Sequence, residues 1–203
     1  MTDIWLFRHG ETHWNRQKLY QGQKNSDLTE KGIRDITGMA EQIRGIRFAA
    51  AYCSPLGRTR QTLELLAPRA DSIRFDHRIQ EISLGEMEGR PFDSLSPELN
   101  EADRRFWEEP ENFRAPGGES LREVHLRVED FIRQILREPG PVLVVTHTIP
   151  VRIFLNRFLG RELPRFWEEP AIPAGSLIRI QGDPPAVRSI VSPGNPVVSG
   201  RPL

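Results

Sequence analysis

The sequence predicts an α/β fold, a three-layer α/β/α sandwich with a mostly parallel central sheet. Two observations lead to this prediction. Residues 4–7 and 142–145 are short, unbroken apolar runs, which are typical of strands covered on both faces. Between these runs, apolar residues recur every three or four positions, as they do on helices with one buried face. The alternation of the two patterns indicates β-α units.

The first third of the chain predicts two helices and one further strand. Residues 29–46 predict a helix with Thr29 as its N-cap, residues 49–53 a strand, and residues 58–67 a helix that Pro68 ends. The apolar face expected for the first helix consists of Ile33, Ile36, Ala40 and Ile43.

Residues 77–118 interrupt this pattern because glycine and proline recur throughout the segment. The breaks fall at Gly85, Gly89, Pro91, Pro97, Pro110 and Pro116. We therefore expect short helices and loops, which form an insertion over the ends of the predicted strands.

The C-terminal part predicts α/β elements again. Residues 119–138 have the clearest helical stripe, and Ser120 is suited to cap the start of that helix. A helix over residues 151–159 and strands over residues 177–181 and 187–191 follow the strand at 142–145.

The 203 residues are interpreted as one domain, with a loose tail from about residue 192 to 203 that is rich in Pro, Gly and Ser. Lys plus Arg equal Asp plus Glu at 28 each, which argues against partners such as nucleic acid or a membrane surface. The single cysteine, Cys53, and the short N-terminal apolar run favour a cytoplasmic protein without a membrane span. The oligomeric state stays open, with a homodimer among the alternatives.

The strand expected at residues 4–7 leads into Arg8, His9 and Gly10, and Asn15 follows closely. Arginine offers a planar fork of donors that suits phosphate oxygens, and glycine lets a ligand approach the backbone. A lone histidine is more often a structural residue, but the position of His9 at a strand end beside an arginine favours a nucleophile in an anion site.

Six segments in order resemble the histidine phosphatases, the superfamily that also contains the cofactor-dependent phosphoglycerate mutases. The resemblance extends over almost the whole chain. The segments are residues 8–15 (RHGETHWN), 20–32 (YQGQ and LTEKG), 54–62 (SPLGRTRQT), 81–89 (EISLGEMEG), 116–120 (PGGES) and 145–147 (VTH).

The resemblance implies a role for particular residues. It implies His9 as nucleophile, Glu81 as proton donor and His147 as second catalytic histidine. It also implies a set of residues that bind the substrate phosphate. These are Arg8, Asn15, Gln21, Gly22, Arg58 and Thr148. Thr148 departs from the family pattern, which commonly has a small residue such as glycine there.

We expect a metal-independent phosphatase that hydrolyses a small phosphomonoester through a phosphohistidine, with no cofactor. Two guanidinium groups and donors such as His147 would compensate the charge of the phosphoryl group without a metal ion. Two alternatives stay open, a cofactor-dependent phosphoglycerate mutase and a non-enzymatic binder of phosphorylated ligands. The resemblance favours the phosphatase, because the segment from Glu81 to Gly117 is short compared with the insertion of the mutases.

The hexapeptide Arg-Phe-Trp-Glu-Glu-Pro occurs twice, at residues 105–110 and 165–170. A repeat architecture needs at least three similar units, and the flanking sequences do not match. The two copies are therefore interpreted as a coincidence or as two similar exposed helix ends, and they receive no function. The identity of the leaving group is also not encoded in any motif of the sequence.

Overall fold

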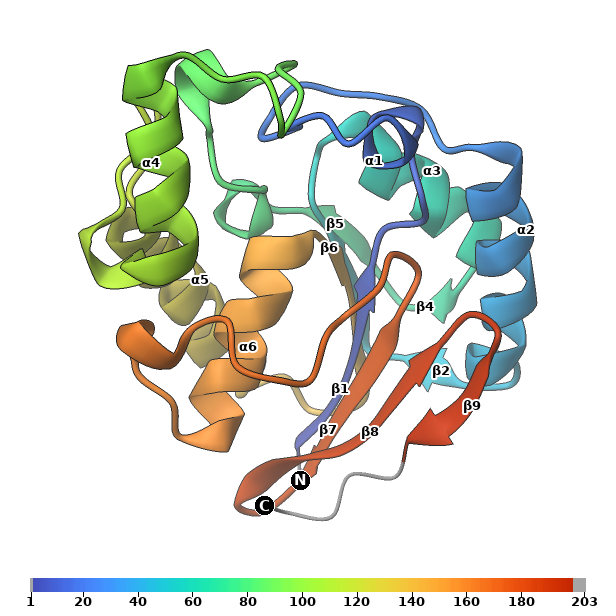
Figure 1. Ribbon diagram of the computed structural model, residues 1–203. Helices are drawn as coiled ribbons and strands as arrows, with labels where there is room; N and C mark the ends of the chain where they lie inside the picture. Colours follow the sequence, from blue (N-terminus) through green and yellow to red (C-terminus); the bar gives the residue numbers. More distant parts are fainter. Residues whose placement is uncertain (1, 199–203) are drawn as a thin grey trace.

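A seven-stranded mixed sheet forms the centre of the molecule, in a computed structural model that describes residues 2–198 (Figure 1). Four strands are parallel, in the order β5 (Ile73–Phe75), β3 (Ala50–Cys53), β6 (Val142–Thr146) and β1 (Thr2–Arg8). Three antiparallel strands extend the sheet, β7 (Leu177–Gly182), β8 (Pro185–Ser192) and β9 (Asn195–Val198). A separate two-stranded sheet pairs β2 (Arg47–Phe48) with β4 (Arg69–Ala70).

Helices cover both faces of this sheet, which confirms the three-layer α/β/α prediction (Figure 1). The helices α2 (Glu30–Met39) and α3 (Gly57–Leu66) lie on one side, and α5 (Leu121–Ile135) and α6 (Thr148–Leu159) on the other. Successive residues of β6 belong to two different cores, because neighbouring side chains of a strand point to opposite faces. Val142 and Val144 pack with α5 and α6, whereas Leu143 and Val145 pack with α2 and α3.

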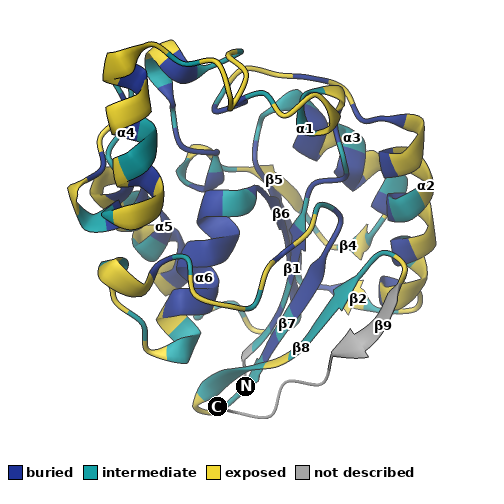
Figure 2. Cartoon of the chain, in the orientation of Figure 1, coloured by how far each residue is buried: buried dark blue, intermediate teal, exposed yellow. Residues whose placement is uncertain are grey.

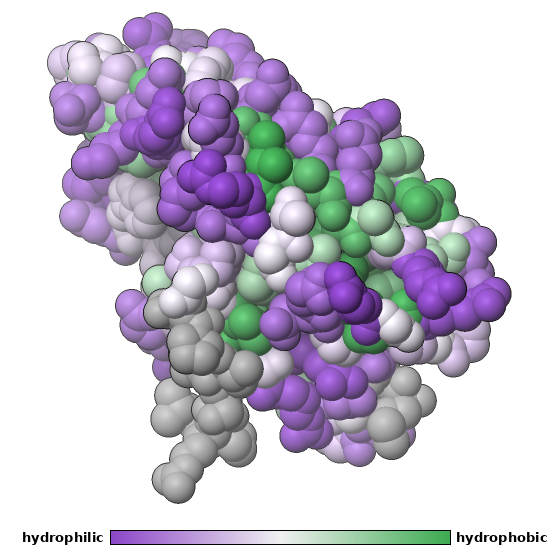
Figure 3. Space-filling model, turned by 90° about the vertical axis from the view of Figure 1, so that its right-hand side faces the viewer, coloured by the Kyte–Doolittle hydropathy of each residue, from purple (hydrophilic) through white to green (hydrophobic). Residues whose placement is uncertain are grey.

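The helix predicted over residues 29–46 is shorter than expected. Thr29 caps it as predicted, its hydroxyl accepting a bond from the Gly32 amide over 2.9 Å, and the helix ends at Met39 in a 3-10 turn, η1 (Ala40–Ile43). Ile36 is fully buried, but Ile33 is 42% exposed at the margin of the buried face. On the side of the molecule that carries α2, hydrophobic residues form a band bordered by hydrophilic ones (Figure 3).

The strongest helical pattern of the sequence folds as expected. α5 begins with a capping box in which Ser120 and Glu123 each satisfy a backbone amide of the other, and its apolar stripe is fully buried. α6 begins at Thr148, three residues earlier than predicted, so its first amides directly follow His147. The central strands and most of α6 are buried (Figure 2).

The insertion at residues 77–118 contains a longer helix than the sequence suggested, α4 (Pro97–Glu108), which Ser96 caps. Its other elements are the short 3-10 turns η2 (His77–Ile79), η3 (Gly85–Met87) and η4 (Pro110–Asn112). Two further short elements are α1 (His13–Arg16) and η5 (Leu163–Arg165).

The strands predicted at residues 177–181 and 187–191 are present as β7 and β8. Within the tail that the sequence predicts to be loose from residue 192, residues 195–198 pair with β8 as strand β9. Residues 199–203 lie outside the described part of the chain. No helix within residues 2–198 is long and apolar enough to cross a bilayer.

Candidate active site

The ends of β1 and β6 bring the two predicted catalytic histidines together. The two strands are parallel neighbours, with Arg8 paired with Thr146, so the residues that follow them leave the sheet at the same edge. The His9 amide donates to the Thr146 carbonyl over 2.9 Å, and the imidazole rings of His9 and His147 have centroids 5.3 Å apart. Two residues separated by 138 positions thus lie next to each other because of strand order.

His9 has the tautomer of a nucleophile. Its Nδ1 lies 2.8 Å from the carbonyl oxygen of Gly10, which can only accept, so Nδ1 carries the proton and Nε2 a lone pair. Burial, together with the charges of Arg58 and Arg8, lowers the pKa of His9 well below its usual value. The imidazole is therefore neutral, and Arg58 Nε donates to its Nε2 over a long 3.3 Å.

His147 is fully buried and bonds through Nε2 to the hydroxyl of Ser54 over 2.7 Å. Burial and the charge of Arg58 hold the pKa of His147 well below its usual value. Its Nδ1 has no hydrogen-bond partner among the described residues. The ring is thus fixed by Ser54 and keeps one nitrogen for a ligand. Ser54 follows β3, and its role was missed because a serine after a strand carries no specific signal by itself.

Arg8 and Arg58 enter the site from different elements. Arg58, in the first turn of α3, is 1% exposed and donates to the carbonyls of Gly22 (2.7 Å) and Lys24 (2.8 Å). Burial lowers the pKa of each of these arginines to about 10, so both keep their charge at neutral pH. Gly22 has φ +50°, and a Cβ there would lie 2.1 Å from the Glu88 carboxylate, so only glycine fits.

Asn15 and Gln21 meet at the hydroxyl of Thr12. Asn15 Oδ1 accepts from the amide and hydroxyl of Thr12, both over 3.1 Å, which leaves its NH₂ group available to a ligand. Gln21 Nε2 donates to the same hydroxyl over 2.8 Å. Both side chains line the cleft, and Thr12 is the residue that orients them. The sequence identified Thr12 only as part of a motif.

The carboxyl group of Glu81, a residue of the insertion, lies against the first turn of α6. Its Oε1 accepts from the amides of Ile82 and Ile149 over 3.1 Å each, and its Oε2 accepts from the amide of Thr148 over 3.0 Å. Burial nevertheless raises the pKa of this carboxyl, and the charges of Arg58 and Arg8 oppose the rise. A raised pKa favours the protonated carboxyl, which is the form that can donate a proton.

An arginine of α5 holds the backbone around Glu81. Arg127 donates to the carbonyls of Arg78 and Gln80 over 2.8 Å and to that of Glu81 over 3.0 Å, and it pairs with the Glu119 carboxylate. The sequence gave no signal for this residue, because an arginine on an amphipathic helix is ordinarily a solvated charge.

All nine predicted site residues except His147 line one cleft of about 450 Å³, and His147 lies buried beside His9. The far part of the cleft has hydrophobic walls, to which the insertion contributes strongly. These walls include Leu19, Tyr20, Leu84, Phe92, Phe106, Trp107 and Trp167. No group of three His, Cys, Asp or Glu side chains within the described range is arranged to hold a metal ion. The chemistry that the cleft supports is the binding of a tetrahedral anion beside a neutral imidazole.

Comparisons with known proteins agree with this geometry. A protein of Salmonella choleraesuis named "Probable phosphoglycerate mutase GpmB" is 35% identical over 163 residues, which are 79% of this chain and 76% of the relative. The structure of YhfR from Bacillus stearothermophilus superposes with a TM-score of 0.86 at 30% identity, covering 97% of this chain and 98% of that one. A "putative alpha-ribazole-5'-P phosphatase" of Escherichia coli superposes with a TM-score of 0.81 at 26% identity, covering 92% and 94%. The model of the histidine phosphatase superfamily (branch 1) matches residues 4–191, and the chain belongs to that superfamily.

Proposed function

We propose that the protein is a phosphatase that hydrolyses small phosphomonoesters through a phosphohistidine on His9, without a metal ion. The observation that carries this proposal is the state of two side chains in one cleft. His9 is neutral with its lone pair on Nε2, and burial raises the pKa of the Glu81 carboxyl, which favours its protonated form. A nucleophile and an acid of this kind together support transfer of a phosphoryl group.

In the first step, His9 Nε2 attacks phosphorus and forms a P–N bond while the P–O bond to the leaving group breaks. Glu81 gives its proton to the leaving oxygen, so that an alcohol departs and a carboxylate remains. Arg8, Arg58 and the NH₂ group of Asn15 compensate the charge on the three other phosphoryl oxygens. His147 donates from Nδ1 to the same group.

In the second step, the Glu81 carboxylate takes a proton from water as the water oxygen attacks phosphorus. The P–N bond breaks, its electron pair returns to His9 Nε2, and inorganic phosphate leaves. The Glu81 carboxyl is then protonated again, so the enzyme returns to its starting state.

The other candidate function is that of a phosphoglycerate mutase, which transfers the phosphoryl group to a second position of its substrate. The name of the Salmonella relative favours it. A mutase returns the phosphoryl group from His9 to a phosphoglycerate, whereas a phosphatase gives it to water. Release of inorganic phosphate from 3-phosphoglycerate and from p-nitrophenyl phosphate, each with and without 2,3-bisphosphoglycerate, separates the two. Phosphate release that does not need the bisphosphate supports the phosphatase.

The phosphohistidine gives the direct test. After brief mixing with a labelled phosphomonoester and quenching, the wild-type protein is expected to carry label that is stable in base and labile in acid. His9→Ala is expected to carry none and to lose activity, because no other residue in the cleft replaces the lone pair of His9. His125→Ala, on α5 and outside the cleft lining, is the control and should label like the wild type. Label on the His9→Ala protein, or phosphate release at the wild-type rate without labelled protein, would contradict the mechanism.

A further inference from the structure

The two copies of the repeated hexapeptide fold against each other. The copy at residues 105–110 spans the end of α4, and the copy at residues 165–170 follows η5. The rings of Trp107 and Trp167 have centroids 4.5 Å apart at an angle of 38°, and Trp167 Nε1 donates to the Phe106 carbonyl over 2.6 Å. The sequence favours a coincidence or two similar exposed helix ends, whereas these contacts show that the two copies pack together.

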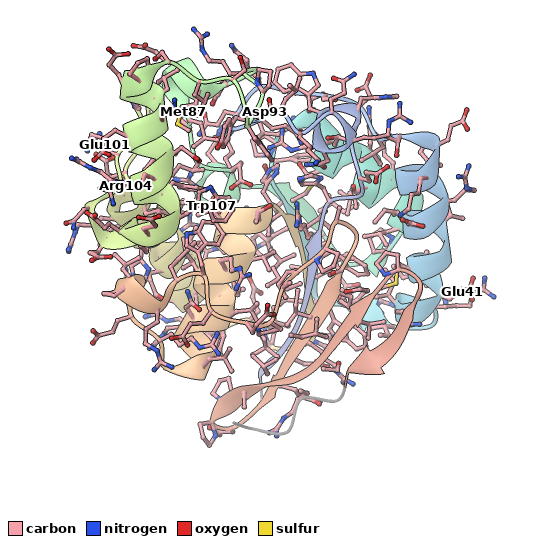
Figure 4. All side chains as sticks on the ribbon, in the orientation of Figure 1. Glu41, Met87, Asp93, Glu101, Arg104 and Trp107 are labelled. Carbon is pink, nitrogen blue, oxygen red and sulfur yellow. The ribbon has the colours of Figure 1, made fainter. Side chains whose placement is uncertain are left out.

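This aromatic pair forms part of the wall of the active-site cleft. Trp107, Trp167 and Phe106 all line the cleft that contains His9. Trp107 lies on the side of α4 that faces α6, whereas Glu101 and Arg104 lie on the opposite side (Figure 4). Half of the Trp107 side chain is exposed, so part of an indole face is available to a molecule in the cleft.

The polar atoms of both indoles are already engaged. Trp107 Nε1 donates to Asp103 over 3.0 Å, and Trp167 Nε1 bonds to the backbone as described above. The rings therefore offer flat apolar surface and no free donor. Tyr20 and Phe92, whose rings lie 4.4 Å apart, add a second aromatic pair to the cleft lining.

The charges of the cleft argue against a carboxylate on the leaving group. Among the described residues that line it, the cations are Arg8 and Arg58, and both are needed for the phosphoryl group. The other ionisable side chains of the lining besides His9 and Tyr20 are the acidic residues Glu11 and Glu81, and neither of them can pair with an anion. A leaving group with its own carboxylate would face these acids and the apolar rings, without a cation to pair with.

We propose that the leaving group of the substrate binds to the apolar surface that the paired rings of Trp107 and Trp167 present to the cleft. We call this pair of residues the aromatic clamp. The preferred substrates are then phosphomonoesters of alcohols that carry an aromatic ring or a broad apolar group and no carboxylate. Stacking on the indoles and removal of apolar surface from water supply the selectivity. The assignment of a substrate class rests on the proposed phosphatase function, whereas the clamp itself also predicts binding.

The test compares 2-phenylethyl phosphate with ethyl phosphate. Both esters release a primary alcohol, so a difference between them reports contact with the ring rather than the acidity of the leaving group. We expect the wild type to favour the phenylethyl ester about tenfold or more in kcat/KM, as burial of a ring predicts. Trp107→Ala is expected to reduce this ratio about tenfold. Phe75→Ala, an exposed aromatic residue on β5 away from the cleft, should leave the ratio unchanged.

A binding measurement separates the clamp from the chemistry. The dissociation constants of 2-phenylethylphosphonate and ethylphosphonate, which cannot be hydrolysed, are expected to show the same preference and the same loss in Trp107→Ala. Trp167→Phe, which keeps a ring but loses the bond to Phe106, is expected to reduce the preference by less. Thermal unfolding of each variant checks its fold.

The outcomes assign failure to one proposal or the other. If ethyl phosphate is hydrolysed but the ratio of kcat/KM for 2-phenylethyl phosphate to that for ethyl phosphate is the same in the wild type and in Trp107→Ala, the phosphatase stands and the clamp is wrong. If neither ester is hydrolysed but the phosphonates show the preference, the clamp stands and the phosphatase is wrong. A higher kcat/KM for 3-phosphoglycerate than for 2-phenylethyl phosphate would also overturn the clamp.

Discussion

At the scale of single residues, burial moves the titrations of His9 and Glu81 in opposite directions. Burial disfavours the charged form of any group, so it lowers the pKa of the histidine and raises that of the carboxyl. The arginines reinforce the first shift and oppose the second. Both shifts favour the neutral forms that the first step needs, a lone pair on His9 Nε2 and a proton on Glu81.

The pH dependence of kcat/KM tests this assignment. We expect activity to fall toward acid pH as His9 gains a proton, at a pH well below the usual histidine pKa, and toward alkaline pH as Glu81 loses one. Glu81→Gln cannot lose a proton, so its profile should lack the alkaline limb that Glu81 causes. Its rate on ethyl phosphate should be about 100- to 10,000-fold lower.

Glu86→Gln is the matched control for that experiment, because Glu86 is an exposed acid in the same segment and does not line the cleft. Its profile should superpose on that of the wild type. An unchanged rate of Glu81→Gln on ethyl phosphate would remove Glu81 from the role of acid.

At the scale of elements, α5 positions the Glu81 loop from outside the cleft. Arg127 donates to three backbone carbonyls in and before that loop and pairs with the Glu119 carboxylate. The Glu119 carboxylate in turn accepts from the Ser83 amide over 2.8 Å. The loop therefore depends on one guanidinium, although Arg127 itself is not among the residues that line the cleft. We describe Arg127 as a positioning residue.

Arg127→Gln is expected to lower kcat on ethyl phosphate while KM changes little, because Glu81 loses its alignment but the phosphate-binding arginines stay in place. We also expect a loss of about 2–4 kcal/mol in the free energy of unfolding, since several buried acceptors lose a charged donor. Arg127→Lys, which keeps the charge, should recover part of kcat.

Arg133→Gln serves as the control on the same helix, because the Arg133 side chain is 62% exposed and pairs only weakly with Asp130. Kinetic measurements and chemical denaturation on the three variants give both readouts. Equal losses of kcat and stability in the Arg127 and Arg133 variants would argue against a specific role of Arg127.

At the scale of the whole molecule, the fold encloses two neutral imidazoles at the edge of its sheet. Burial holds the pKa of both His9 and His147 well below the ordinary value of a histidine. The unfolded chain takes up protons at these residues near pH 6.5, whereas the folded chain does not. The free energy of unfolding therefore falls as the pH drops below that value.

The expected loss is about 1.4 kcal/mol per pH unit for each histidine below the unfolded pKa. Glu81 contributes in the opposite sense, because its raised pKa makes the folded state bind its proton more tightly. The free energy of unfolding of His147→Asn should therefore fall less steeply with decreasing pH than that of the wild type. The contribution of Glu81 is present in both proteins, so it does not account for the difference. Urea denaturation between about pH 7 and pH 5 measures the two slopes. Equal slopes would contradict the assignment of His147 as a buried neutral residue.

Much of the fold was predictable because local patterns carry it. The apolar runs at 4–7 and 142–145 are strands, and the stripe and capping residue Ser120 identified α5 closely. The prediction was poorer where the pattern was mixed. The insertion contained the full helix α4, and α6 begins at Thr148 rather than at Val151, with Pro150 in its first turn, where proline is tolerated.

The site was predictable as a set of residues but not as a set of contacts. Motifs of the histidine phosphatases identified His9, Arg58, Glu81 and His147, and the structure brings them together. The bond from Ser54 to His147 joins residues 93 positions apart, and no local pattern in either segment predicts it.

The sequence by itself determined the strands, the capped helices and, through motifs that resemble the histidine phosphatases, the residues that are proposed to bind and transfer a phosphoryl group. Each of these depends on neighbouring positions, through side-chain periodicity or the chemistry of a short motif. The tertiary structure alone decided that Arg127 holds the Glu81 loop and that the two hexapeptides meet in the cleft. Such contacts depend on how strands and helices pack over long distances in the chain, and a pattern of neighbouring residues contains no information on that packing.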